Sequence, residues 1–517
     1  MRLYPPNARV ALKNGKFVDV VNGCYFAPDV SLMLEGGKIR AMPGLPGEAA
    51  DLPVDLTIDL QGKTVIPGLF NTHTHLQMTF PSLLAGLSDI KRANACKARQ
   101  IAKNMADCLA HGVTHVRDAL TEDLRRNRTL KAQIASGAMA GPRIWQNVVV
   151  SQLGGSFTPP RNWADRLLFR LFGMPQVDYA DPASGSVVFP PEADAQTVRD
   201  AVNRAIDERG ADGIKIYEQA EKRLTYKPGA TVMTLAQLAA LTDQARRRGV
   251  PTTMHHTSVA SFRRAVQTGV TSFAHLPLDA LLTEADIAAF NAAGGIIEPT
   301  VSLAYYLCWN IKGHACYEHP EFHQLADFRN RTQAALATAF WLPELRESVK
   351  AGLAKANQGK MKLLGILDIS GPFTYYARLI PTGIANLRRL AAQGACLACA
   401  NDAGAVPCTA AMLQHEIDLC ALFLDESSGK SRFSGADALR MATINSAKAM
   451  GIEQQFGSIR TGKTADLVVV DGDPFADMRV IGSRAAALFM DGKMVINNCG
   501  LQVEATNHRQ KMEGSRI

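Results

Sequence analysis

The chain has 517 residues, of which 47% are hydrophobic and 20% are charged, so it can bury a large core. Its formal net charge of +8 is spread along the sequence without a long basic run, so we expect no nucleic-acid partner. Apolar runs such as 485–490 are far shorter than the roughly 20 residues that cross a bilayer, and residues 1–14 lack the apolar segment of a signal peptide. Ten scattered cysteines favour a reducing compartment, so we expect a soluble cytoplasmic protein without a membrane partner.

The two ends of the chain share a pattern of short strands and turns. Over 10–43, apolar stretches are broken by turn-forming pairs such as Asn14-Gly15, which are typical of hairpins. The apolar stretches within 466–496 repeat this pattern. We therefore predict a small β-sandwich domain built from both termini, residues 1–63 and 456–500, followed by a polar tail over 501–517.

Between these ends, apolar stretches alternate with helical stretches rich in Ala, Leu and Arg, a pattern that predicts a parallel sheet covered by helices. The eight predicted strands are 64–75, 112–118, 143–151, 212–218, 250–256, 271–275, 295–302 and 395–402. They favour an α/β fold of the (β/α)₈ TIM-barrel type over 64–455, whose active site lies at the C-terminal strand ends. An open doubly wound sheet is the alternative, but no G-x-G-x-x-G motif follows an early strand.

Two cysteines of the eighth strand have a spacing that metal sites use. Cys396 and Cys399 form a lone C-x-x-C pair, whereas a zinc ribbon needs a second pair. Their surroundings are small and apolar, so we assign both to a buried parallel strand.

The connection between the seventh and eighth strands, about 303–392, is longer than an ordinary loop and rich in Tyr, Trp and Phe. An additional helical core would explain this composition, and so would a lid over the active site. Because the segment leaves from the C-terminal end of a strand, we favour the lid.

Reactive side chains gather at the ends of the predicted strands. His73 and His75 are two residues apart, so both imidazoles point to the same face of a strand and can reach one metal ion. Lys215 lies within an apolar strand, where an unpaired ammonium would be costly. The fifth, sixth and eighth strands end with His255-His256, His275 and Asp402.

This set of residues resembles the amidohydrolase superfamily, particularly its imidazolonepropionase and prolidase-like branch. Supporting phrases are the apolar run at 65–70 before the HTH motif, GVTHVRD at 112–118, TINSA at 443–447, and the glycine-rich stretch 457–467. The resemblance covers nearly everything outside the insert and the polar tail.

The resemblance implies a site for two divalent metal ions, for which we expect zinc. The six ligands that it implies are His73, His75, Lys215, His255, His275 and Asp402. The two histidines of the first strand and the aspartate would bind one ion, and the histidines of the fifth and sixth strands the other. The lysine, carboxylated by carbon dioxide, would bridge both ions. His256 points to the opposite face from its neighbour and would be a packing residue.

Three departures from the family pattern bear on the substrate. Many relatives carry Gly-Gly-His after the third strand, whereas this chain has Gly154-Gly155-Ser156. Relatives usually have Thr before the aspartate of the eighth strand, whereas this chain has Asn401. The insert after the seventh strand is also longer than we would expect, which suggests an unusual substrate pocket. The substrate contacts that we expect are Tyr217, Ser156, Tyr305 and Trp309.

The mechanism that the resemblance implies begins with a hydroxide that bridges the two metals and attacks a carbonyl carbon. Asp402 would be the catalytic acid/base, accepting the proton of the hydroxide and passing it to the leaving nitrogen. We therefore predict a hydrolase that cleaves an amide or cyclic-amide C–N bond in a small molecule and forms a homo-oligomer.

Two alternatives stay open at this point. A mononuclear deaminase of the same superfamily would lack the lysine of the fourth strand and commonly carry H-x-x-E on the fifth, where this chain has Ser258. A non-catalytic assembly protein on the same scaffold would have lost metal ligands, whereas all six positions are filled here. A metal content of about two, one or none per chain would distinguish the three.

Overall fold

Parallel strands form the centre of the larger part of the protein. The computed structural model describes Pro5 and residues 8–48, 52–78, 87–121, 123–156, 179–221, 229–309, 315–357, 362–363, 367–368, 370–404, 406–424 and 433–506. Within them, parallel strands lie side by side in the order β8, β9, β10, β12, β13, β14, β15 and β18. Their bounds are Leu69–Thr74, Val113–Asp118, Arg143–Gln152, Gly213–Glu218, Thr252–His256, Ser272–Ala274, Ile296–Glu298 and Cys396–Leu397. A further parallel strand, β11 (Ser186–Phe189), pairs with β10.

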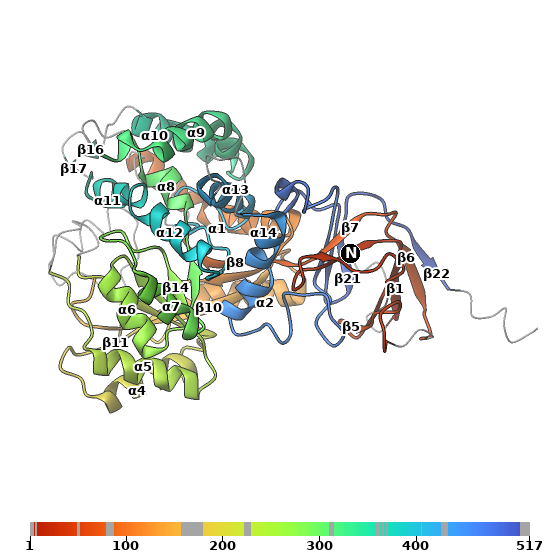
Figure 1. Ribbon diagram of the computed structural model, residues 1–517, viewed down its shortest axis with the longest axis horizontal. Coiled ribbons are helices and arrows are strands. Elements are labelled where there is room, and N and C mark those ends of the chain that lie inside the picture. The colour runs from red at the N-terminus through yellow and green to blue at the C-terminus, as the bar shows by residue number, and fades with distance from the viewer. Residues whose placement is uncertain are drawn as a thin grey trace, which may run out of the picture.

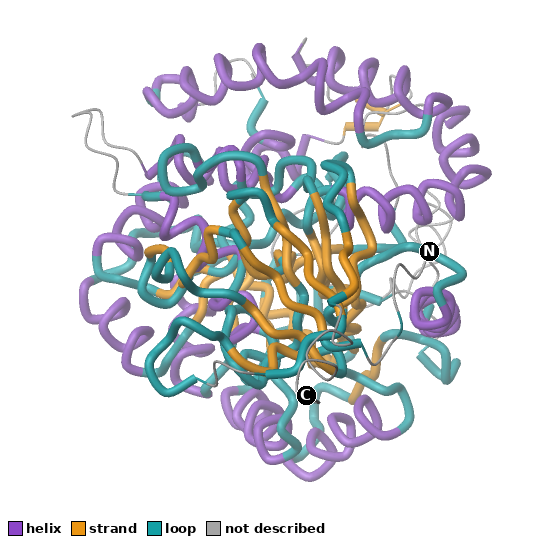
Figure 2. Tube along the Cα trace, turned by 90° about the vertical axis from the view of Figure 1, so that its right-hand side faces the viewer, coloured by secondary structure: helices purple, strands orange, loops and turns teal. Residues whose placement is uncertain are grey.

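The two ends of this sheet meet and close it. The backbone N–H of Thr72 in β8 donates to the carbonyl of Cys399 over 2.9 Å, and a parallel bridge joins Thr74 to Ala403. Figure 2 shows the strands in the middle of the molecule with helices around them. The predicted (β/α)₈ barrel is therefore confirmed. Cys396 lies in β18 but is only half-buried, whereas Cys399 is buried two residues after the strand ends, so the prediction of one buried strand for both is only partly confirmed.

The helices around the barrel begin where side chains can cap them. Thr234, Ser258, Thr283 and Ser434 accept hydrogen bonds from the backbone N–H three residues later, which satisfies one of the free donors of α5, α6, α7 and α14. The helices of the barrel are α1 (Leu87–Ala110), α2 (Leu124–Ser136), α4 (Ala195–Asp207), α5 (Leu235–Arg247), α6 (Val259–Thr268), α7 (Glu284–Ala292), α13 (Leu413–Leu424), α14 (Gly435–Ala442) and α15 (Ile444–Ala449).

The predicted first strand, 64–75, is two strands that belong to two different sheets. β7 (Thr64–Pro67) pairs with β19 and β2 of the terminal domain, whereas β8 pairs with β9 of the barrel. Gly68 separates them, and a Cβ at this position would lie 2.2 Å from the hydroxyl oxygen of Thr114. The single-strand prediction was wrong because an apolar run carries no mark of the sheet that each residue joins.

The terminal domain consists of two sheets, seen on the right of Figure 1. One sheet has the order β22-β6-β1-β4-β5, and the other has the order β21-β20-β19-β7-β2-β3. The remaining bounds are β1 (Val10–Lys13), β2 (Lys16–Asp19), β3 (Cys24–Tyr25), β4 (Leu32–Glu35), β5 (Lys38–Ala41), β6 (Leu56–Asp59), β19 (Leu467–Val470), η3 (Met478–Val480), β20 (Ala487–Met490), β21 (Lys493–Asn497) and β22 (Val503–Ala505). The two-sheet domain built from both termini is confirmed. β22 corrects one detail, because it pairs with β6 where a polar tail was predicted from residue 501 onward.

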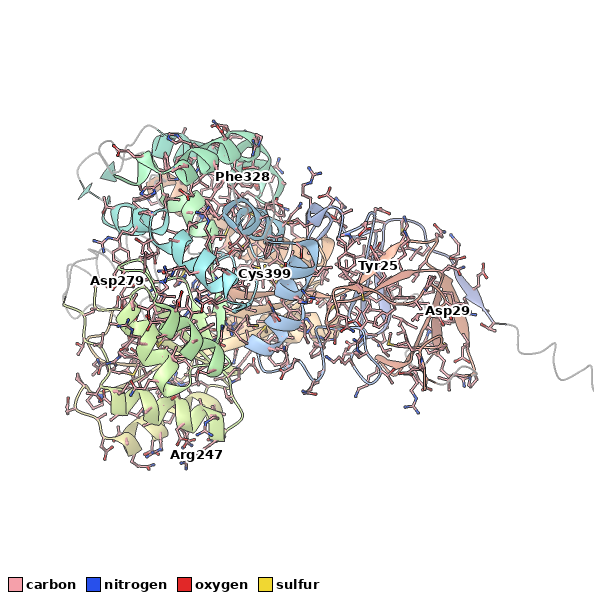
Figure 3. All side chains as sticks on the ribbon, in the orientation of Figure 1. Tyr25, Asp29, Arg247, Asp279, Phe328 and Cys399 are labelled. Carbon is pink, nitrogen blue, oxygen red and sulfur yellow. The ribbon has the colours of Figure 1, made fainter. Side chains whose placement is uncertain are left out.

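The insert between β15 and β18 is mainly helical. Its elements are α8 (Ser302–Leu307), η1 (Ala315–Glu318), α9 (Pro320–Ala339), α10 (Pro343–Asn357), β16 (Lys362–Leu363), β17 (Leu367–Asp368), α11 (Ser370–Tyr376), η2 (Ala377–Leu379) and α12 (Gly383–Ala392). The insert is fastened to α1 by an ion pair between Arg99 and Glu344 at 2.8 Å and a hydrogen bond from Ser348 to Asp89 at 2.6 Å. Figure 3 shows Phe328 among the helices of the insert and Cys399 near the centre of the barrel.

None of the helices in the described ranges is long and apolar enough to cross a membrane.

Candidate metal centre

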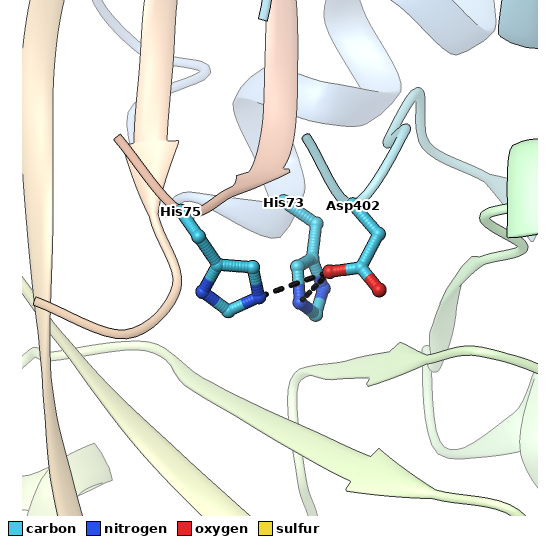
Figure 4. Close-up of side chains that lie close together, drawn as sticks. All are labelled: His73, His75 and Asp402. Carbon is cyan, nitrogen blue, oxygen red and sulfur yellow. Dashed lines mark hydrogen bonds and ion pairs between the residues drawn. The ribbon is translucent and has the colours of Figure 1, made fainter. Parts of the chain in front are cut away.

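Three of the predicted ligands meet at the C-terminal end of the barrel. Nε2 of His75 lies 2.9 Å from Oδ1 of Asp402, and Nε2 of His73 lies 3.4 Å from the same oxygen (Figure 4). The three side chains are buried, and their potential ligand atoms lie within 4.8 Å of one another. Two imidazoles and a carboxylate at this spacing form a donor set that suits a divalent metal ion.

The other predicted ligands continue around the same end of the barrel. The ring centroid of His275 lies 5.1 Å from that of His73 and 4.6 Å from that of His255. Tyr217 follows, with its centroid 5.4 Å from the His255 ring and 5.3 Å from Nζ of Lys215. The structure thus links all six predicted ligands by a chain of neighbouring side chains.

The backbone is strained where this end of the barrel is formed. Asp402, His275 and Thr300 have φ angles of 50°, 74° and 49°, values that residues other than glycine rarely adopt. His275 and Thr300 follow β14 and β15 within two residues, and Asp402 lies in the segment after β18. Such strain persists only where the surrounding structure enforces it, and it is typical of functional sites.

Hydrogen bonds orient the rings of two further predicted ligands, His255 and His275. The hydroxyl of Thr300 donates to the carbonyl of Pro299, so it accepts from Nδ1 of His275 over 2.8 Å. Nε2 of His255 lies 2.6 Å from Oε1 of Gln219, which can only accept. These contacts place the ring proton of His275 on Nδ1 and that of His255 on Nε2.

Burial and charge give the centre the protonation states that a metal requires. Burial lowers the pKa of His73 to about 4, so its imidazole is neutral at pH 7. Burial alone would raise the pKa of Asp402, but the neighbouring His73 and His75 hold it well below its usual range. Neutral imidazoles and an ionised carboxylate are the ligand forms that bind metals. The residues present therefore fit a metal ion.

Lys215 is an unusual residue for the interior of a barrel. It is fully buried in β12, and its Nζ has no hydrogen-bond partner within the described parts of the chain. Burial lowers its pKa to about 7, against the attraction of Glu298. A large fraction of this side chain is therefore a neutral, nucleophilic amine at pH 7.

His256 has a packing environment, in line with its predicted orientation. Its ring lies 5.6 Å from the ring of Phe262 and 5.7 Å from that of Phe273, among the hydrophobic side chains that cover the barrel. Burial lowers its pKa to about 4.

The four predicted substrate contacts lie in different surroundings. Tyr217 is beside His255, as described. The hydroxyl of Ser156 donates to the carbonyl of Glu221 over 2.6 Å. Ser156 is the last described residue before position 179. Tyr305 packs against His415 at 4.6 Å, while Trp309 lies 4.0 Å from the guanidinium of Arg329. Tyr305 and Trp309 therefore contribute to the interior of the insert.

Two other aromatic residues of the insert lie beside residues of the candidate centre or their chain neighbours. The hydroxyl of Tyr375 in α11 donates to the hydroxyl of Thr257, two residues after His255, over 2.6 Å. Trp341, between α9 and α10, lines a small space beside His75 together with Asn104. The sequence analysis included Tyr375 and Trp341 only as part of an aromatic insert, because nothing local marks which aromatics face the barrel.

Glu298 and Arg117 were also missed. Glu298 ends β15 and is fully buried, with Oε2 lying 3.5 Å from Nδ1 of His73. Arg117 of β9 donates to the other oxygen of Glu298. The sequence does contain a signal for both residues. Each is a charged residue inside a strand whose other side chains are mostly uncharged, and a buried charge needs a partner.

Relatives usually have Thr at the position of Asn401. The side chain of Asn401 bonds to neighbouring segments of the chain and not to the carboxylate of Asp402. Its Oδ1 accepts from Nδ2 of Asn71 over 2.8 Å, and its own Nδ2 donates to the carbonyl of Thr409 over 3.0 Å. This residue therefore ties the first strand to the loop after the eighth.

Comparisons with known proteins agree with this architecture. The model of a family described as "Amidohydrolase family" matches residues 64–498. A prolidase crystallised with N-methylphosphonate-L-proline is 23% identical, with a TM-score of 0.61 over 95% of this chain and 100% of that one. Molinate hydrolase is 20% identical, with a TM-score of 0.62 over 95% of each chain.

A curated relative matches only locally. The 5-methylthioadenosine/S-adenosylhomocysteine deaminase of Bacillus thuringiensis (strain Al Hakam) is 56% identical over 83 residues. That match covers 16% of this chain and 13% of the deaminase, so the chain spans only a small part of this relative.

Proposed function

Because the chain belongs to the amidohydrolase family, we propose that it uses two divalent metal ions to hydrolyse an amide or cyclic-amide bond in a small molecule. The observation that carries this proposal is the buried cluster of His73, His75 and Asp402 at the end of the barrel, with a buried lysine and two further histidines beside it. Zinc is the metal that we propose, since imidazole and carboxylate ligands suit it.

The ligands divide between the two ions according to their neighbours. His73, His75 and Asp402 would hold one ion, and His255 and His275, whose rings adjoin each other, would hold the second. Bound divalent ions lower the pKa of water to about 7 and polarise a carbonyl group.

Lys215 would bridge the ions as a carbamate. Its neutral amine attacks the carbon of carbon dioxide, an N–C bond forms, and one proton leaves to solvent. The side chain then changes from a neutral amine to an anion with two oxygen donors. The lack of a hydrogen-bond partner for Nζ among the described residues supports this assignment, because a buried ammonium without partners is costly.

Asp402 has the position of a proton carrier. Its carboxylate is ionised in the folded protein, and its Oδ1 faces both histidines of the first strand. An ionised carboxylate accepts the proton of the attacking water and then transfers it to the nitrogen that leaves, which otherwise departs as a poor anionic leaving group.

The insert would shape the substrate pocket. Tyr375 and Trp341 reach the barrel end from the insert, so we propose that the insert is a lid that selects substrates with an apolar or aromatic group. An Xaa-Pro dipeptidase and molinate hydrolase, which are among the similar structures, suggest Xaa-Pro dipeptides and molinate as first compounds to test. We propose a cytoplasmic homo-oligomer, and the ten free cysteines agree with a reducing compartment.

A mononuclear deaminase is the second candidate, since the local match to a deaminase favours it. Ser258, three residues after His255, is occupied as the N-cap of α6 and offers no carboxylate. The buried Lys215 also has no role in a site with one metal. We therefore rank amide hydrolysis first.

The test is metal analysis combined with a substrate panel. Protein freed of metal with a chelator and then reloaded with zinc should retain about two ions per chain and cleave at least one amide, with the released amine identified by mass spectrometry. His275→Ala should abolish turnover, whereas His319→Ala, at a half-buried position without a capping hydrogen bond, should not. Ammonia release with one bound metal would support the deaminase, and a protein that binds no zinc would refute both.

A further inference from the structure

We propose that Glu298 is a positioning residue for the metal ligand His73, and that Arg117 holds Glu298 in place. The inference rests on the proposed function, since it concerns how one metal ligand is oriented. Neither the family match nor the predicted ligand set assigns a role to the end of the seventh strand.

The contact between Glu298 and His73 is the main observation. Oε2 of Glu298 lies 3.5 Å from Nδ1 of His73, and both side chains are at most 1% exposed. Neither atom has a hydrogen-bond partner in the described parts of the chain. Two buried polar atoms that face each other without other partners are most simply satisfied by each other, with Nδ1–H as the donor.

The opposite nitrogen of the same ring points into the metal centre. Nε2 of His73 lies 3.4 Å from Oδ1 of Asp402. A proton held on Nδ1 by a carboxylate leaves the lone pair on Nε2, which is the arrangement that orients metal-binding histidines in many proteins. Glu298 would therefore determine both the tautomer and the direction of the ring.

Arg117 explains why Glu298 keeps its position. Its guanidinium donates to Oε1 of Glu298, to Oγ1 of Thr253 over 3.2 Å and to the carbonyl of Ala449 over 3.1 Å. A carboxylate held between this guanidinium and the imidazole of His73 is fixed in position and direction.

A purely structural ion pair is the competing explanation. In that case Glu298 would serve only to neutralise Arg117, and the metal centre would not depend on the distance from its carboxylate to His73. The two explanations differ in what happens to zinc affinity when the carboxylate is altered but the pocket stays filled.

Chelator competition on the zinc-loaded full chain separates them. Glu298→Gln and Glu298→Asp should each weaken zinc binding by about 10- to 100-fold, because the first removes the charge and the second withdraws the carboxylate from His73. The matched control is Glu416→Gln, since Glu416 is also fully buried but accepts from the backbone N–H groups of Val301 and Ser302 at 2.8 Å. The control should change zinc affinity by less than about threefold.

A crystal structure of the zinc-loaded wild-type protein tests the same contact independently, and it does not depend on the folding of any variant. The contact from Nδ1 of His73 to Glu298 should shorten to about 2.7–2.9 Å, with Nε2 as the ligand atom. Coordination through Nδ1, or zinc affinity in both Glu298 variants equal to the control, would overturn the inference. If the wild-type protein binds no zinc, the proposed function itself would be refuted.

Discussion

Asp402 has two roles in the proposed reaction, as a metal ligand and as a proton carrier, and the substitution Asp402→Asn separates them. Asparagine keeps an oxygen donor and nearly the same volume at a position that is only 6% exposed. An amide cannot accept a proton at neutral pH. We therefore expect the variant to fold and to retain much of its metal while losing the proton transfer.

The magnitude of the loss follows from the structure and the leaving group. Oδ1 of Asp402 is 2.9 Å from His75 and 3.4 Å from His73, so the amide oxygen can take the same position toward a shared ion. Loss of a positioned acid/base costs about 10²- to 10⁴-fold in rate, or roughly 3–5 kcal/mol in the barrier. The cost should be at the upper end for an amide, whose nitrogen leaves only after protonation.

The assay compares an amide with an activated ester of the same acyl group. Asp402→Asn should reduce kcat on the amide by at least about 100-fold, but reduce it much less on the ester, whose leaving group needs no proton. Metal content per chain is measured in parallel. Near wild-type turnover of the amide would refute the proton-carrier role. Equal losses on amide and ester, together with loss of metal, would show that Asp402 acts only as a metal ligand.

Three further predictions concern other parts of the molecule. Lys215→Ala should lose metal and activity, and a short carboxylic acid at high concentration should restore part of both; a metal-loaded crystal structure with a bare Lys215 amine would contradict the carbamate. Tyr375→Phe removes the 2.6 Å hydrogen bond to Thr257, so it should change the ratio of kcat/KM between bulky and small amides by about two- to tenfold without changing metal content; equal effects on both substrates would indicate a purely structural insert. Burial raises the pKa of Asp418 in α13 from 3.8 to about 6, so its contribution to stability is present in full below pH 4 and is lost as the pH rises through 6. Asp418→Asn should therefore raise the melting temperature at pH 7.5 more than at pH 5, by an amount equivalent to about 1–2 kcal/mol; an equal change at both pH values would show that Asp418 is not the titrating group.

The fold was largely predictable because its signals are local and repeated. Alternation of apolar and helical stretches predicts parallel strands, and the resemblance to amidohydrolases is confirmed by the match over residues 64–498. The place where the chain changes sheets was not predictable. Gly68 separates two apolar runs that look alike in sequence, and only the close approach of Thr114 shows why the residue between them must be small.

The candidate site was predictable where it depends on strand ends. His73, His75 and Asp402 come from opposite ends of the barrel sequence, yet parallel strands in a closed sheet must bring their C-terminal ends together. The partners of these ligands could not be found in the same way. Which side chain faces Nδ1 of His73 depends on the tilt of the barrel and on the rotamers of Glu298 and Arg117, and neither is encoded in spacing.

Charge balance connects the proposed carbamate to the buried residues that the sequence analysis missed. Arg117 is countered at the barrel end by the carboxylate of Glu298, and Asp402 supplies a further negative charge; all three side chains are nearly inaccessible to solvent. Two divalent ions would bring four positive charges into this interior, where uncompensated charge is costly. Carboxylation turns the neutral amine of Lys215 into an anion and so offsets one of those charges, whereas Glu298 is already neutralised by Arg117. The same pair that positions His73 therefore leaves Lys215 as the group whose charge must change for the site to hold two metals.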